Sequence, residues 1–132
     1  MTESKLPGDE PLKITLLDEV GEINRFVSAK INDNGDLVIS GQDVGKRLEE
    51  LVGDSDYEYW VTVLSEHKKR VLESLIEYCN QKTIPTLPMP SNQDLYLLVL
   101  IKRAFGDKRS VSENFRDFLD VGSIPFQFYN YV

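Results

Sequence analysis

The stretch from Tyr57 to Val63 constrains the fold of this chain more strongly than any other. Nearly every residue in it is aromatic or β-branched, and these types fit the pleated, half-buried surface of a β-strand. Because side chains alternate along a strand, the run has two faces. One face carries Tyr57, Tyr59, Val61 and Val63, and the other carries Glu58, Trp60, Thr62 and Leu64. The first face is the better candidate for the core, because the second includes a charge and a hydroxyl group.

A helix is predicted directly after this strand. Ser65 is suited to the N-cap position, since its hydroxyl can accept a hydrogen bond from an early helical N–H. Glu66 then lies in the first turn, where the helix dipole favours a negative charge. Apolar side chains follow at helical spacing and form one stripe, made of Val71, Leu72, Leu75, Ile76 and Cys79.

The chain of 132 residues is long enough for one domain that buries a core without disulfides or metal. Cys79 is the only cysteine, and its place on the apolar stripe predicts a small buried side chain. The lack of a cysteine framework and of a signal peptide or spanning apolar run favours a cytoplasmic protein. We expect residues 1–11 to be a flexible leader and residues 12–132 to be a single domain.

An antiparallel meander is predicted for the first part of the domain. Its strands are expected at Lys13–Asp18, Ile23–Ile31 and Leu37–Ser40. Between the last two, Asn34-Gly35 supplies the two positive-φ residues of a type I′ turn. The segment Gly41–Gly45 is then expected to leave the sheet. A short helix is expected next, capped by Asp43 and carrying Val44, Leu48, Leu51 and Val52.

Two more helices and a last strand are predicted after a connector rich in proline. Ser91-x-x-Asp94 opens a helix that is apolar nearly all round and should be the most buried. Ser110-x-x-Glu113 is a capping-box pattern for the next helix, with Gly122 as its left-handed C-terminal residue. The apolar stripe of that helix is Val111, Phe115, Phe118 and Leu119, and the last strand is Phe126–Tyr131. The whole pattern predicts an α+β fold, an antiparallel sheet of about five strands with three main helices packed on one face.

Three segments of the chain together form a recognisable pattern. They are Gly41–Gly45 (GQDVG), Gly53–Trp60 (GDSDYEYW), and Phe115–Leu119 (FRDFL) running on to Gly122-x-Ile124-Pro125-Phe126. This pattern resembles a family of small bacterial proteins of unknown function, over roughly residues 35–132. The resemblance implies a bacterial origin and a single domain.

Charge and motifs narrow the function classes. The net charge of −7 argues against nucleic acid and anionic membranes as partners, because both bind basic surfaces, and it suits a basic protein partner better. The sequence has no glycine-rich phosphate loop and no His or Cys pair at metal spacing. His67 is the only histidine, and no serine or cysteine is placed to pair with it, which disfavours a hydrolytic triad. We therefore expect no catalytic residue and no cofactor.

An acidic run close to Trp60 is the candidate partner-binding surface. Its residues are Asp43, Glu49, Glu50, Asp54, Asp56 and Glu58, with Trp60 beside them. An electronegative patch of this kind speeds the encounter with a basic protein. The alternative is a solvated surface in which Asp54 and Asp56 serve as turn formers. The sequence favours a non-enzymatic interaction protein, with a toxin-neutralising, immunity-like role as its most concrete form.

Two other function classes stay open. Asp54, Asp56 and Glu58 are hard oxygen ligands that could serve a metal-assisted hydrolase. Along one extended strand, however, they would spread over about 13 Å, which is too far for a single ion. The remaining class is a small-molecule-binding domain, whose pocket the sequence does not locate. No metal site is expected.

Overall fold

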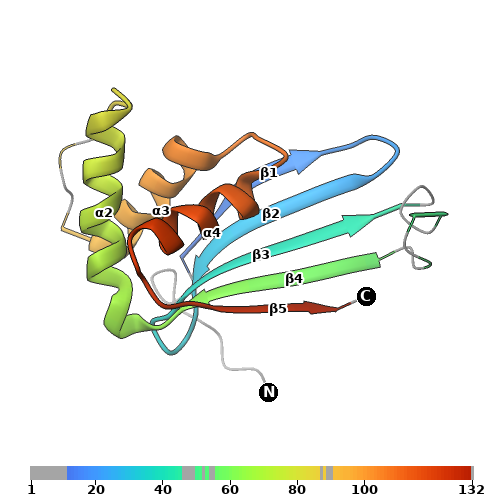
Figure 1. The fold of residues 1–132 in the computed structure, drawn as a ribbon, viewed down its shortest axis with the longest axis horizontal. Helices are drawn as coiled ribbons and strands as arrows, with labels where there is room; N and C mark the ends of the chain where they lie inside the picture. The colour runs from blue at the N-terminus through green and yellow to red at the C-terminus, as the bar shows by residue number, and fades with distance from the viewer. Residues whose placement is uncertain are drawn as a thin grey trace, which may run out of the picture.

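The computed structural model describes residues 12–45, 50–51, 53, 56–86, 88 and 91–131. These residues form an α+β fold in which a five-stranded antiparallel sheet, in the order β1-β2-β3-β4-β5, carries its helices on one side (Figure 1). The strands are β1 (Lys13–Glu19), β2 (Asn24–Ile31), β3 (Leu37–Val44), β4 (Asp56–Val63) and β5 (Gln127–Tyr131). The helices are α2 (Lys68–Gln81), α3 (Gln93–Phe105) and α4 (Val111–Val121). The predicted fold class is confirmed; the predicted leader, residues 1–11, lies outside the described residues.

One hydrophobic core lies between the sheet and the helices. In β4, Val61 and Val63 are fully buried, whereas Trp60 lies on the opposite side, as the alternation predicted. Helix α3 is the most buried, also as predicted, through Tyr96, Leu97, Leu98, Leu100, Ile101, Ala104 and Phe105. The predicted stripes of the other helices reach the same core through Val71, Leu72, Leu75 and Cys79 in α2 and Val111, Phe115 and Leu119 in α4.

Strand β3 continues to Val44, so the prediction that the chain leaves the sheet at Gly41 is wrong. The glycine is part of the strand because the ring of Tyr59 in β4 lies against it, and a Cβ at position 41 would overlap that ring. Asp43 is therefore a strand residue and does not cap a helix. Of the predicted short helix, Leu51 is helical, and Leu48 and Val52 lie outside the described residues.

The turn after β2 and the start of α2 differ from the prediction because side-chain hydrogen bonds hold their backbone. In the turn, only Gly35 has a positive φ, so it is not of type I′. The Asn32 side chain accepts hydrogen bonds from the N–H groups of Asn34 and Asp36 and supports the loop. Ser65 does not cap α2; its own N–H donates to Asp36 Oδ1 at 2.8 Å, and a 3₁₀ turn precedes the helix.

The ends of α3 and α4 also differ in detail. Asn92 caps α3 in place of Ser91, accepting a hydrogen bond from the Leu95 N–H at 3.0 Å. Helix α4 begins after Ser110 as predicted, but the Ser110 hydroxyl accepts from the Asn114 amide and makes no capping bond. At its C-terminus the left-handed residue is Ser123 and not Gly122. The bond from Ile124 N–H to Leu119 C=O closes that turn one residue later than predicted.

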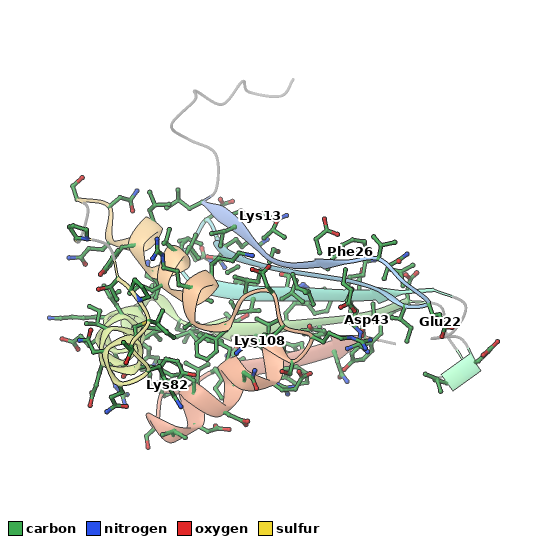
Figure 2. The ribbon with its side chains drawn as sticks, turned by 90° about the horizontal axis from the view of Figure 1, so that it is seen from above. Lys13, Glu22, Phe26, Asp43, Lys82 and Lys108 are labelled. Atoms are coloured by element: carbon green, nitrogen blue, oxygen red, sulfur yellow. The ribbon has the colours of Figure 1, made fainter. Side chains whose placement is uncertain are left out.

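The helices cover only one side of the sheet, and the strands continue beyond the start of α4 (Figures 1 and 2). We call the side that faces the helices the covered face and the opposite side the open face. No helix of the described residues lies on the open face. Figure 2 shows Phe26 on the open face and Asp43 on the covered face.

Candidate functional site

The open face is built from side-chain rows that cross the sheet, because paired residues of an antiparallel sheet lie side by side. One row is Thr15, Ser28, Ser40, Trp60 and Tyr129, and the next is Asp18, Phe26, Gln42, Glu58 and Tyr131. The alternation of each strand fixes which side chains reach this face. Small polar residues predominate on β1 to β3, and aromatic residues gather on β4 and β5.

A shallow groove opens to solvent where β4 pairs with β5, and we call it the β4–β5 groove. Its lining residues are Glu58, Trp60, Thr62, Tyr129, Asn130 and Tyr131. Tyr129 and Tyr131 are 59% and 68% exposed, and the half-buried Trp60 lies opposite Tyr129 in the same row. Exposed aromatic side chains that lie together on one surface are typical of binding sites, because a partner that covers them buries a large apolar area.

Negative charge lies at one end of the β4–β5 groove. Glu58 is half-buried between Gln42 and Tyr131 in its row, and the Gln42 amide donates to its carboxylate at 3.5 Å. Asp56 begins the same strand two residues earlier and therefore projects from the same face. The groove thus combines apolar rings with the Glu58 carboxylate, and both kinds of group recognise cationic side chains.

The structure brings together part of the predicted partner-binding surface and separates the rest. Asp56, Glu58 and Trp60 share the open face, as the alternation of β4 requires. Asp43 pairs with Arg25 and Tyr57 in the register and lies on the covered face. Glu50 is exposed in the connection between β3 and β4. Glu49 and Asp54 lie outside the described residues.

The metal alternative rests on Asp54, Asp56 and Glu58. Among the described residues, no group of three or more His, Cys, Asp or Glu side chains is arranged to hold a metal ion. Asp54 lies outside those residues, so the trio as predicted is not described.

Tyr129 and Tyr131 were not among the predicted site residues, although their strand was predicted. Period-two alternation places both on one face of Phe126–Tyr131, and this signal was available. Which face that is depends on the pairing of β5 with β4, where Tyr129 lies opposite Trp60 and Tyr131 opposite Glu58. Such register information is not contained in the strand pattern itself.

A second polar cluster lies on the covered face, at the start of α4. Burial raises the pKa of Asp43, and the charge of Arg25 opposes this rise. Burial, with a contribution from the Asp43 charge, raises the pKa of the Tyr59 hydroxyl to about 12, so this hydroxyl stays protonated at neutral pH. Ser112 lies near the Tyr59 hydroxyl and opposes the rise, but the Ser112 oxygen has no partner in hydrogen-bond geometry.

No family model, no curated protein and no solved structure matches this chain. The resemblance of its motifs to small bacterial proteins therefore stays a prediction. The described residues also contain no helix with the length and apolar character needed to cross a membrane.

Proposed function

We propose that this protein is a non-enzymatic interaction module that binds a basic protein through the β4–β5 groove. The observation that carries the proposal is the gathering of Trp60, Tyr129 and Tyr131 on a sheet face that no described helix covers. Tryptophan and tyrosine are enriched among the residues that dominate protein interfaces. Their position beside Glu58 gives the groove both apolar area and a fixed charge.

The sign of the charge favours a basic partner. An arginine or lysine of the partner could stack on the ring of Trp60 and reach the Glu58 carboxylate, which lies two residues away on the same face. The net charge of −7 would attract such a partner over a longer distance and raise the association rate at low salt. An immunity-like role, in which the groove masks the functional surface of a basic toxin, is the concrete form of this proposal.

The first test identifies partners by comparing variants. The full chain, a Tyr129→Thr/Tyr131→Thr variant and a Val121→Ser control are used to capture proteins from cells of the source organism. Val121 is an 88% exposed apolar residue of α4 on the other side of the molecule, so its loss removes exposed apolar surface away from the groove. We expect basic proteins that the wild type and the control retain and the groove variant loses. Retention of the same proteins by all three would contradict the proposal.

The second step measures the purified partner. Trp60 is the only tryptophan of the chain and lines the groove. The change in its fluorescence on binding, followed by stopped flow, therefore gives the association rate. We expect Glu58→Gln to slow association by about twofold to fivefold at low salt and by less at high salt, because the charge acts through space and is screened. An association rate that is unchanged by this substitution and by salt would rule out the charge-guided part of the proposal.

A further inference from the structure

A small cavity lies on the covered face, between the first turns of α4 and the strands beneath it. Its volume is about 60 Å³, and its polar lining includes Arg25, Asp43, Tyr59, Ser112, Glu113 and Arg116. These residues come from β2, β3, β4 and α4, so only the folded domain assembles them. The volume exceeds that needed for a single water molecule and is sufficient for a group of a few heavy atoms.

Three residues that line this cavity each carry a buried hydrogen-bonding atom without a partner among the described residues. These atoms are Nε of Arg25, Nε of Arg116 and Oγ of Ser112. Ser112 is the most deeply buried of the three residues, since it is only 1% exposed. A buried donor without an acceptor destabilises a protein, and such groups are rare in folded proteins. Because all three residues line the same cavity, one acceptor bound there could satisfy them together.

The surroundings hold these donors in place. The guanidinium of Arg116 lies 4.1 Å from the centre of the Phe128 ring and is oriented by this contact. Arg25 Nε is 3.9 Å from Asp43 Oδ1, close enough for charge attraction but too long for a hydrogen bond, so its N–H stays available. Ser112 is the second residue of α4, an eleven-residue helix whose N-terminal dipole favours a negative charge.

The identity of the ligand follows from the charges in the lining. Arg25 and Arg116 offer positive charge, but Asp43 and Glu113 line the same cavity and repel a doubly charged anion. A third guanidinium, that of Arg109, is held by Glu19 at 2.9 Å. A singly charged, planar acceptor therefore fits better than phosphate, and the fork of a guanidinium matches a carboxylate.

We propose that this cavity binds the carboxylate group of a small ligand, through the N–H groups of Arg25 and Arg116 and the hydroxyl of Ser112. The Tyr59 hydroxyl, which stays protonated, also lines the cavity and is available to a second polar atom of the ligand. The carboxylate can belong to a free small acid or to the C-terminus of a peptide. The site lies on the other side of the sheet from the β4–β5 groove and is independent of the function proposed above.

The experiment compares thermal unfolding of the full chain in sodium acetate, sodium glycolate and sodium chloride at equal ionic strength. Ligands that bind only the folded state stabilise it, so we expect the organic acids to raise Tm by roughly 4 °C or more at tenfold their Kd. Ser112→Ala should leave Tm in chloride unchanged or slightly higher, because it removes an unpartnered hydroxyl. The same change should weaken acid binding about tenfold, since it removes a hydrogen bond to a charged group.

Arg116→Gln and Arg103→Gln form the matched pair of arginine variants. Arg103 donates to the Pro85 carbonyl and does not line the cavity. We expect Arg116→Gln to abolish the acid-dependent rise in Tm and Arg103→Gln to retain it. Because we expect Ser112→Ala to keep the fold, its acid-dependent rise in Tm decides the result even if Arg116→Gln lowers Tm in every salt.

Two further ligands distinguish the source of the carboxylate and test its charge. A tripeptide with a free C-terminus is compared with its C-terminal amide; stabilisation by the free form alone assigns the site to peptide termini, and stabilisation by glycolate alone assigns it to small acids. Inorganic phosphate should give a smaller Ser112-dependent rise than acetate. Equal Tm values in acetate and chloride, or a larger Ser112-dependent rise in phosphate, would overturn the proposal.

Discussion

Gly41 lies in the middle of β3 because the ring of Tyr59 occupies the space that a side chain would need. This contact places the Tyr59 ring against the backbone of β3, and Tyr59 also lines the cavity below α4. The contact between Gly41 and Tyr59 also explains why the first glycine of Gly41–Gly45, a segment predicted to leave the sheet, lies within a strand. One residue without a side chain thus allows one large residue to be buried.

A methyl group at position 41 should therefore be costly. We expect Gly41→Ala to lower the free energy of unfolding by about 1–3 kcal/mol, the usual range for inserting atoms into a packed site. Urea denaturation measures this value, and Gly21→Ala is the control because only a backbone oxygen, at 3.9 Å, is near that position. In a Tyr59→Val background the loss should shrink, because the ring is then absent. Equal losses in both backgrounds would show that the Tyr59 ring is not the cause.

At the scale of helices and strands, the N-cap residue of α3 differs between the sequence pattern and the structure. Asn92 makes the capping bond that the pattern assigned to Ser91. We expect Asn92→Ala to lower the free energy of unfolding by about 0.5–2 kcal/mol, as loss of an N-cap does. Ser91→Ala, its neighbour, should change it by less than about 0.5 kcal/mol, since Ser91 is an exposed residue with no cap to lose. Chemical denaturation of both variants decides between the two caps.

The elements themselves were predictable, because hydrophobic period depends on the core and not on the details of the ends. Tyr57–Val63, the α2 stripe and the all-round apolar helix α3 were all located correctly. The start of α2 was not, since a partner distant in sequence decides it. Asp36 binds the N–H of Ser65 across 29 residues, and no local pattern contains that contact.

The candidate sites also differ in how far the sequence predicts them. Glu58 and Trp60 could be assigned to one face from alternation within β4, and Tyr129 and Tyr131 could be assigned to one face of their own strand. The cavity could not be predicted, because Arg25 and Arg116 meet only where α4 docks on the sheet.

At the scale of the whole molecule, the helix layer places the two faces of the sheet in different environments. All three helices pack against the covered face, so the core depends on that face alone among the described residues. The open face carries exposed aromatic rings that add little to the core. Exposed rings that contribute little to the core are available for binding, and we expect that Tyr129 and Tyr131 can be changed without loss of the fold.

This division predicts how stability responds to paired substitutions on the two faces. Tyr129→Thr with Tyr131→Thr should change the free energy of unfolding by less than about 1 kcal/mol, because both rings are mostly exposed and threonine suits a strand. Ile39→Ala, in the fully buried centre of β3, should lower it by about 2–5 kcal/mol through lost transfer energy and a cavity. Urea denaturation followed by Trp60 emission measures both variants. If the tyrosine variant is as unstable as Ile39→Ala, the open face supports the fold, and lost partner capture by that variant reflects unfolding. If it is as stable as the wild type, the same loss of capture belongs to the groove itself.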